Sequence, residues 1–187
     1  MMKIITAPNV VLRQVSTPVN TQERHLQRLL DQLQQTLSHS DIGVGLAAPQ
    51  IGVNLRVLAL KLTPANQVVC YLNPQITQTS TDKTLRSREQ KKDDLEGCLS
   101  LPKIYAPVPR YEWINVTYQQ LENGKLVDKS ERFSQFAARV FQHEYDHLDG
   151  ILFLDRALDA GTSLYYEKNG ELTEIDRQQL QKILPNF

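Results

Sequence analysis

The sequence predicts an α+β fold in which small mixed or antiparallel β-sheets pack around a central helix, with an amphipathic helix near the N-terminus and another helix near the C-terminus. Predicted strands and helices occur in separate runs and do not alternate as βαβ units. Leucines recur at helical spacing between residues 21 and 37. Asn123-Gly124 lies between two alternating apolar runs, which is a strong signal for a β-hairpin.

The first half of the chain predicts one helix followed by a small sheet. Residues 21–37 form the amphipathic helix, and short β-rich runs at residues 57–62 and 68–72 predict strands. Residues 77–94 are polar, carry charges of both signs and lack periodicity, which predicts a solvated loop. The leucines that we expect to hold the first helix against the core are Leu26, Leu29, Leu30, Leu33 and Leu37.

The second half predicts a hairpin that leads directly into the central helix. The hairpin strands are residues 113–118 and 126–133. Ser134 is the expected N-cap of the helix, and Gly150 is expected to end it in the left-handed conformation. The later elements are a loop at Gly161, a turn at Asn169-Gly170 and a last helix over residues 174–183.

Length and composition restrict the class of protein. One domain spanning residues 1–187 is sufficient. Lys plus Arg and Asp plus Glu number 21 each, so no net charge attracts nucleic acid or acidic lipid. No run of eighteen apolar residues occurs, and Pro8 interrupts the apolar N-terminal patch. With only two cysteines, a disulfide framework is not expected. We therefore expect a soluble, cytoplasmic protein with no membrane and no sequence-specific nucleic-acid partner.

The segment His143-Glu144-Tyr145-Asp146-His147 predicts a metal site on the central helix. Residues four apart share one helical face, so both imidazoles can reach one cation. Glu144 lies beside that position as a candidate base. The helix is expected to present to the interior Phe136, Ala137, Val140, Phe141, His143, Glu144 and His147.

The third ligand has two candidates. One protease class has a third histidine where this chain has Phe153, so that class is excluded. Glu167 lies twenty residues beyond His147 and could complete the site of a zinc endopeptidase. Cys98 follows a glycine in a short apolar segment, and its thiolate would leave a fourth position for water, as in catalytic sites. A small buried hydrophobe is the alternative role for Cys98, and it is the role that we expect for Cys70.

The segment of residues 43–52 predicts a close approach of backbone to a ligand. Its glycines formally match a dinucleotide fingerprint, but Pro49 prevents the required helix and no acid occurs at residues 60–70. Glycines also allow a substrate chain to approach the backbone. The Gln50 side chain offers an amide donor suited to an oxyanion, the alternative being a tight turn with a structural glutamine.

Taken together, three segments resemble the three signature motifs of the peptide deformylases. They are GVGLAAPQ at residues 43–50, EGCLS at residues 96–100 and QHEYDHLDG at residues 142–150. The chain resembles that family from about residue 3 to residue 157, which leaves residues 158–187 as a C-terminal extension. The resemblance implies one divalent metal ion held by Cys98, His143 and His147. That ion is expected to be Fe²⁺ in the cell and Zn²⁺ or Ni²⁺ in purified protein.

The resemblance also implies a reaction and its substrate. The enzyme would remove the N-formyl group from the initiator methionine of new polypeptides and release formate. It would bind these nascent chains transiently at the ribosome. Glu144 would take a proton from the attacking water and return it to the departing amine. The Gln50 amide and the Leu99 backbone N–H would stabilise the oxyanion. The backbone of Gly45 would pair with the peptide, and Val44, Val140 and the helix face around Phe136 would line the methionine pocket.

Two residues depart from the family pattern. Tyr105 stands where some members have an arginine near the substrate path, and Arg139 stands where an apolar residue is more familiar. We expect Arg139 to lie outside the pocket as a solvated helix residue, because long charged side chains extend toward water. An inactive family member that serves as a binding module is the remaining alternative to an enzyme.

Overall fold

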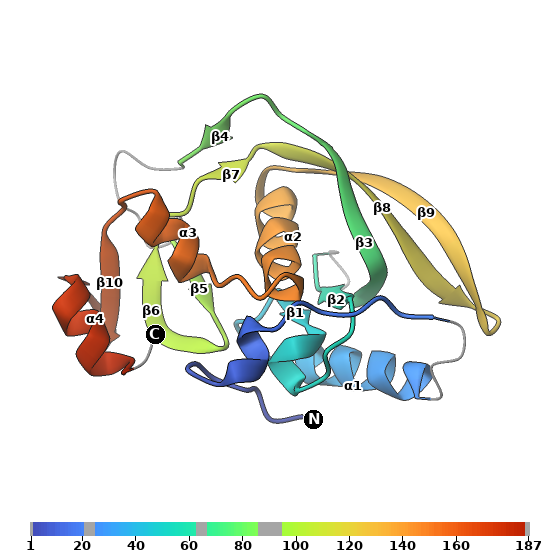
Figure 1. Cartoon of the computed structure of the whole chain (residues 1–187), viewed down its shortest axis with the longest axis horizontal. Coiled ribbons are helices and arrows are strands. Elements are labelled where there is room, and N and C mark those ends of the chain that lie inside the picture. The colour runs from blue at the N-terminus through green and yellow to red at the C-terminus, as the bar shows by residue number, and fades with distance from the viewer. Residues whose placement is uncertain (1, 21–24, 63–66, 86–94, 186–187) are drawn as a thin grey trace.

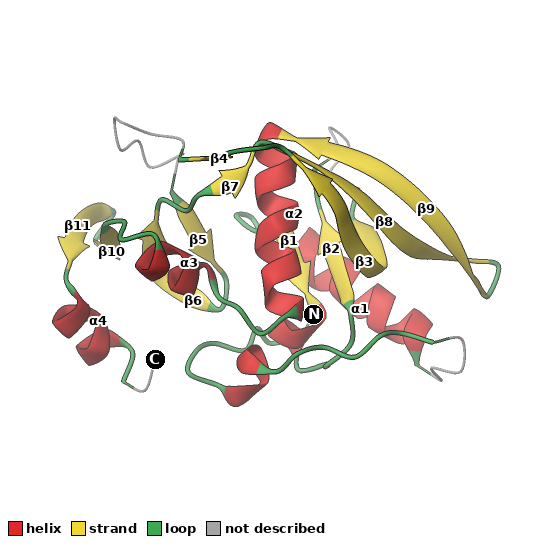
Figure 2. Ribbon diagram, turned by 45° about the horizontal axis from the view of Figure 1, so that its top comes forward, coloured by secondary structure: helices red, strands yellow, loops and turns green. Residues whose placement is uncertain are grey.

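The described strands form three antiparallel sheets in the computed structural model, which describes residues 2–20, 25–62, 67–85 and 95–185. A five-stranded sheet has the order β1-β2-β3-β8-β9, a four-stranded sheet has the order β11-β10-β6-β5, and β4 pairs with β7. Helix α2 lies between the two larger sheets (Figures 1 and 2). The α+β class predicted from the sequence is confirmed.

The strands are β1 (Gly45–Ala47), β2 (Val57–Leu60), β3 (Val69–Thr79), β4 (Lys83–Thr84), β5 (Glu96–Cys98), β6 (Leu101–Ala106), β7 (Arg110–Tyr111), β8 (Trp113–Glu122), β9 (Lys125–Ser134), β10 (Leu164–Lys168) and β11 (Glu171–Ile175). The helices are η1 (Val10–Arg13), α1 (Leu26–Ser38), η2 (Ala48–Ile51), α2 (Gln135–Leu148), α3 (Phe153–Asp159) and α4 (Arg177–Ile183).

Helix α1 packs on the five-stranded sheet through its leucines, as the helical spacing predicts. Its apolar side chains join a core cluster with residues of β1, β2 and β3. Residues 21–24 of the expected helix lie outside the described residues, and the described helix begins at Leu26. The buried leucines of α1 are Leu26, Leu29, Leu30, Leu33 and Leu37.

Strand β3 is longer than the sequence predicts, because it continues through Pro74 to Thr79. Its register with β8 shifts between Leu72 and Gln75, and such an irregularity accommodates a proline in a strand. The loop predicted for residues 77–94 is therefore wrong at residues 77–79 and also at the short strand β4. Residues 86–94 of that loop lie outside the described residues.

The predicted hairpin is confirmed, and it leads directly into α2. Strands β8 and β9 pair from Trp113 opposite Ser134 to the end of the hairpin, where Asn123 and Gly124 both have positive φ. Ser134 is the N-cap, but its side chain makes no capping hydrogen bond. Gly150, with φ of 70°, follows the helix as expected, and a Cβ there would meet the Arg13 carbonyl.

The C-terminal region contains elements that the sequence did not predict. Helix α3 was not expected, and the turn at Asn169-Gly170 joins two strands, β10 and β11, which were not expected either. Helix α4 begins after residue 174, with Asp176 as a capping N-cap. Strand β10 pairs with β6, so this region extends the sheet that carries β5.

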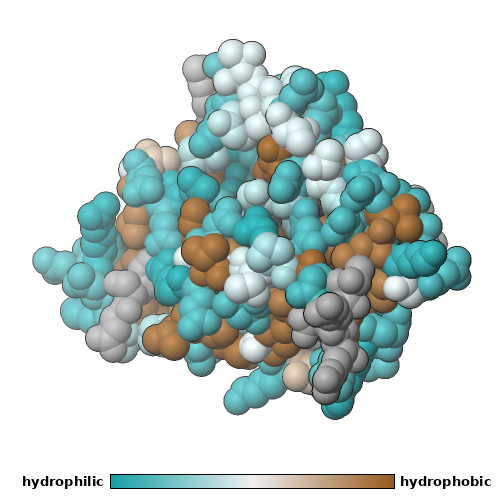
Figure 3. Space-filling view, turned by 45° about the vertical axis from the view of Figure 1, so that its right-hand side comes forward, coloured by the Kyte–Doolittle hydropathy of each residue, from teal (hydrophilic) through white to brown (hydrophobic). Residues whose placement is uncertain are grey.

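The surface gives no sign of a membrane-spanning segment among the described residues. None of their helices combines the length and the apolar character needed to cross a bilayer. The view turned toward the five-stranded sheet is mostly hydrophilic, with hydrophobic residues in smaller areas between (Figure 3).

Candidate metal centre

Cys98, His143 and His147 come together where β5 meets α2. One potential ligand atom from each residue lies within 4.8 Å of those of the other two. The Sγ atom of Cys98 is 3.2 Å from Nε2 of His147. The two histidines are buried and lie one helical turn apart, while a register shift between Gly97 and Cys98 breaks the regular pairing of β5 with β6 at the cysteine.

The donor set fits a divalent transition metal. A thiolate and two imidazoles suit zinc and iron, and three protein ligands leave a position for water. Glu144 lies beside the cluster, and its Oε2 atom is buried without a hydrogen-bond partner among the described residues. A buried carboxylate oxygen with no hydrogen-bond partner can accept a proton from a water molecule at the open ligand position.

The alternative third ligand does not reach the cluster. Glu167 lies on β10, where its carboxylate accepts a hydrogen bond from the Tyr105 hydroxyl at 2.7 Å. It is not part of the metal-ligating group found among the described residues. Phe153, which occupies the position of the third histidine in the excluded protease class, is buried and stacks on His143 with the ring centroids 5.8 Å apart. The endopeptidase that the sequence left open is therefore not supported.

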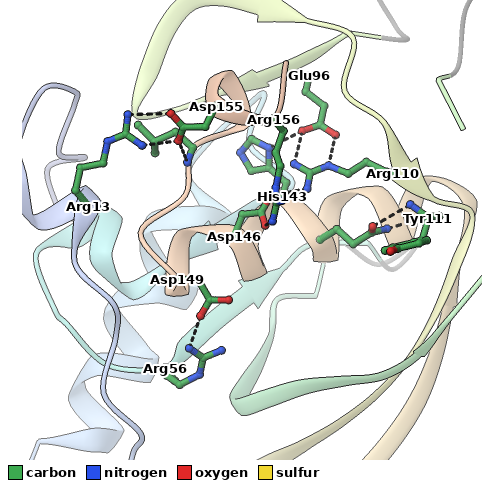
Figure 4. A network of polar contacts seen from close by, with 12 residues as sticks. Arg13, Arg56, Glu96, Arg110, Tyr111, His143, Asp146, Asp149, Asp155 and Arg156 are labelled. Atoms are coloured by element: carbon green, nitrogen blue, oxygen red, sulfur yellow. Dashed lines mark hydrogen bonds and ion pairs between the residues drawn. The ribbon is translucent and has the colours of Figure 1, made fainter. Parts of the chain in front are cut away.

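A buried network behind His143 was missed by the sequence analysis. Nδ1 of His143 lies 2.9 Å from Glu96, and Arg110 donates two hydrogen bonds of 2.9 Å to the same carboxylate. Arg110 also donates to Asp146 at 2.5 Å, and Arg156 donates to Asp146 at 2.8 Å (Figure 4). The only sequence signal for a role of Glu96 was its position in the EGCLS motif. Its distance along the chain from the histidines does not predict that it contacts His143.

The network fixes the protonation of the histidine that it contacts. Burial alone would raise the pKa of Glu96, but the charge of Arg110 and the hydrogen bond with His143 hold it at about 2. Glu96 is therefore a carboxylate that accepts the proton on Nδ1 of His143, which leaves Nε2 as the ligand atom. Burial lowers the pKa of His147 well below its usual value, so its neutral, ligand form is favoured.

Glu144 is held against the backbone of β1. Burial raises the pKa of its carboxyl group to about 7, although the charge of Arg110 opposes that change. A Cβ atom on Gly45 would lie 2.7 Å from Cγ and 2.8 Å from Cδ of Glu144. Gly45 is thus required for the carboxylate to occupy this position.

We expect Gly45→Ala to lower activity strongly while the fold persists. The added methyl group must displace Glu144, and a shift of about 1 Å near a reacting group can cost on the order of 10²-fold in rate. Gly124→Ala in the β8–β9 turn is the control, because its Cβ would meet nothing within 4 Å and the turn lies outside the site. Turnover and circular dichroism of both variants check the prediction, and equal activity of the two would contradict it.

The remaining predicted residues surround the cluster. Gln50 lies in η2, where its Oε1 accepts from the Ala47 N–H at 2.8 Å. Its Nε2 lies 3.2 Å from the Ser100 hydroxyl and 3.5 Å from the Cys98 sulfur, so the amide donor faces the cluster. Leu99 follows Cys98 directly, which places its backbone N–H beside the sulfur ligand.

Two predictions about the surroundings of the methionine pocket need correction. Val140 is buried and half-buried Val44 packs against the same apolar cluster. Phe136, expected to face the interior, is 44% exposed. The Arg139 guanidinium lies 5.3 Å from the centre of the Phe136 ring, so it is half-buried on the helix surface and not fully solvated. Residues 134–136 at the start of α2 are all exposed, so the neighbouring elements leave this turn uncovered and the apolar spacing failed there.

Comparisons with known proteins show which family the chain is similar to. A family model described as polypeptide deformylase matches residues 1–162. Peptide deformylase 2 of Gloeobacter violaceus is 41% identical over 156 residues, covering 82% of this chain and 77% of that protein. The peptide deformylase of Rhizobium meliloti is 40% identical over 155 residues, covering 81% of this chain and 82% of that protein. The crystal structure of the peptide deformylase from Thermotoga maritima superposes with a TM-score of 0.72 at 35% identity, covering 83% of this chain and 97% of that one.

Proposed function

The chain belongs to the polypeptide deformylase family, and from this we propose that it removes the formyl group from the N-terminal methionine of new polypeptides, with Cys98, His143 and His147 as its metal ligands. The observation that carries the proposal is the meeting of these three side chains beside a buried carboxylate, Glu144. A thiolate, two imidazoles and an adjacent base form an open hydrolytic site. We propose that the protein is cytoplasmic and binds its substrate at the ribosome.

The identity of the metal is part of the proposal. A divalent cation in this site supplies a Lewis acid that polarises the formyl oxygen and lowers the pKa of a water molecule. The donor set is compatible with Fe²⁺, Zn²⁺ and Ni²⁺. We propose Fe²⁺ for the cell and expect Zn²⁺ or Ni²⁺ to replace it in purified protein.

The proton transfers are assigned to Glu144. Its carboxylate takes the proton of the attacking water and returns it to the departing amine, so that formate and a free N-terminus result. The Gln50 amide and the Leu99 backbone N–H donate to the negative charge that develops on the formyl oxygen as water attacks the formyl carbon. The geometry in support is the fixed Gln50 amide, whose Nε2 lies 3.5 Å from the Cys98 sulfur.

The edges of two sheets provide a place for the substrate backbone. Strands β1 and β5 each lie at the end of their sheet. A Cβ on Gly43 would lie 3.1 Å from the Leu99 side chain, so the chain before β1 is adjacent to the chain after β5. A peptide that pairs with Gly45 in strand fashion directs its methionine toward Val44 and Val140. Main-chain pairing accepts many downstream sequences, as a substrate class of new polypeptides requires.

Formate release from formyl-Met-Ala-Ser by anaerobically prepared protein tests the proposed function. The unformylated peptide, incubated in parallel, reports any cleavage of the peptide bonds. Formate release with no peptide bond cut supports a deformylase. Peptide-bond cleavage would instead support an endopeptidase, and a metal-loaded protein that binds the peptide without turnover would support the binding module.

We expect Cys98→Ser to lose most of its metal under conditions in which the unchanged protein retains it. A serine hydroxyl is a much weaker ligand for a soft or borderline cation than a thiolate. Metal content after dialysis against a chelator is the measurement. Cys70→Ser is the matched control, because Cys70 is a buried side chain on β3 outside the site. Full metal retention in Cys98→Ser would remove Cys98 from the ligand set.

A further inference from the structure

Strand β9 is the longest strand at an edge of the two larger sheets. It has 10 residues and lies last in the five-stranded sheet, so one of its sides has no strand partner among the described residues (Figure 1). The other end strands, β1, β5 and β11, have 3, 3 and 5 residues. Prolines, bulges and short length commonly prevent edge-to-edge pairing. β9 contains no proline or glycine and has no register shift with β8, so its backbone is a regular template for another strand.

The backbone groups that face the free edge belong to the even-numbered residues of β9. Just beyond the last pair of the hairpin, the Gln135 N–H donates to the Glu112 carbonyl at 2.7 Å, in the same register as β8 and β9. Hydrogen-bonded and non-hydrogen-bonded pairs alternate along antiparallel strands, so the odd-numbered residues of β9 bond to β8. Asp128, Ser130 and Arg132 therefore direct their backbone N–H and C=O groups away from the sheet.

The charges of β9 are complementary to those of a second copy in one antiparallel register. From Asp128 to Arg132 the side chains are negative, positive, neutral, negative and positive. If two copies pair with Ser130 of each at the centre, Asp128 faces Arg132 of the second copy. One position closer to the centre, Lys129 faces Glu131 of the second copy. Facing side chains lie on the same face of the joined sheet, where opposite charges stabilise a strand pair.

Neighbouring registers lack this complementarity. A two-fold axis through any of the four charged residues would place that side chain opposite its own copy, and like charges directly opposite destabilise a strand pair. An axis between two residues is excluded as well, because outward-facing backbone groups of one copy would then meet residues whose groups face β8 in the other. Charges on an edge strand usually prevent pairing. Those of β9 instead select the register centred on Ser130.

The charged side chains of β9 are held at the edge by contacts with β8. Asp128 accepts a hydrogen bond from the Gln119 amide at 2.9 Å, and the Arg132 guanidinium lies 4.0 Å from the centre of the Trp113 ring. The other two charges likewise contact residues of β8. All four side chains are exposed or half-buried. Carboxylate, ammonium and guanidinium groups each make more than one hydrogen bond, so these contacts orient the charges and leave capacity for a second partner.

We propose that β9 is the interface of a two-fold symmetric homodimer, in which the five-stranded sheets of two copies join edge to edge into one sheet. The pairing is centred on Ser130, and the outward-facing backbone groups of Asp128, Ser130 and Arg132 bond across the axis. Such an interface uses the same patch of both copies, and strand addition to a sheet edge supplies its main-chain hydrogen bonds. Because one strand from each copy forms the contact, the dimer is reversible and its population depends on protein concentration.

Sedimentation equilibrium of the full-length, metal-loaded protein tests the proposal and does not depend on the proposed reaction. The dimer fraction should rise with protein concentration and fall as salt screens the facing charges. Asp128→Arg and Arg132→Asp each place like charges opposite one another, so each should raise the dissociation constant of the dimer about tenfold or more. Glu171→Arg is the matched control, because it reverses one exposed charge on another edge strand, β11. It should leave the dissociation constant unchanged.

A mixture of Asp128→Arg and Arg132→Asp should dimerise again, because each altered side chain then faces an opposite charge on the other variant. Ser130→Pro removes the central outward-facing N–H, which makes no bond to β8, so it should prevent dimerisation while circular dichroism shows an unchanged fold. A monomer at all concentrations up to about 1 mM, the weak end of specific binding, would overturn the proposal. So would a dimer that persists in Ser130→Pro, or a mixture that remains monomeric.

Discussion

Replacing Glu144 by glutamine should lower kcat for deformylation by roughly 10²- to 10⁴-fold, the usual contribution of a positioned general base. Glutamine has nearly the same shape, but its amide cannot take a proton from water. Only 4% of the Glu144 surface is exposed, and its Oε2 has no hydrogen-bond partner among the described residues. The carboxylate is therefore available for proton transfer. Formate release by metal-matched samples of both proteins is the measurement.

The same variant should keep its fold and its metal, because Glu144 is outside the ligand group. Metal content and thermal unfolding are measured on the samples used for kinetics. Glu131→Gln, an exposed position on β9, is a suitable control for the effect of removing one charge. Activity of Glu144→Gln within tenfold of the unchanged protein would assign the base to another group. Loss of the metal would show that Glu144 acts by supporting the site.

The local features of the site could be predicted from the sequence because short spacings determine them. His143 and His147 share a helical face whenever residues 135–148 form a helix. The hairpin before that helix follows from Asn123-Gly124, whose positive φ values suit a tight turn. Cys98 could be named as a candidate from its chemistry and its neighbours, but its meeting with the histidines across 45 residues of chain could not be derived from spacing.

Features that depend on distant contacts could not be predicted. The pairing of Glu96 with Arg110 and of Arg110 with Asp146 joins β5, β7 and α2, and no periodicity links these positions. Strand β10 is stabilised by its pairing with β6. Because that contact is distant in sequence, the residues of β10 did not predict a strand, and only the turn that follows it was predicted. The same contact gave Glu167 a partner in Tyr105, where spacing alone had suggested a metal ligand.

The boundaries of elements failed where tertiary pairing overrides local preference. Pro74 suggested the end of a strand, but β3 continues past it beside β8 because the register shifts there. Phe136 has the spacing of a buried helix residue and is nevertheless half-exposed. At the first turn of a helix, the neighbouring elements decide which face is covered, and the sequence pattern does not contain their positions.

Replacing Arg110 by leucine should cause the largest loss of stability among the changes considered. The guanidinium is buried between two buried carboxylates, Glu96 and Asp146, at 2.9 Å and 2.5 Å. Removing one partner of a buried ion pair leaves uncompensated charge and typically lowers the free energy of unfolding by about 3–5 kcal/mol. At about 2–4 °C per kcal/mol for a chain of this size, Tm should fall by roughly 10 °C. Thermal unfolding of metal-loaded protein is the measurement.

Arg110→Leu should also weaken metal binding, because Glu96 would no longer be fixed as the partner of His143. Loss of such a supporting contact typically lowers metal affinity about 10- to 100-fold, which chelator competition can measure. Arg156→Leu is the matched control: its side chain contacts Asp146 but is 39% exposed, so its contribution should be below about 1 kcal/mol. Equal Tm values for the two variants would contradict the dominant role of Arg110. A lower Tm with unchanged metal affinity would mean that the network supports the fold only, and that other contacts such as the packing on Phe153 orient His143.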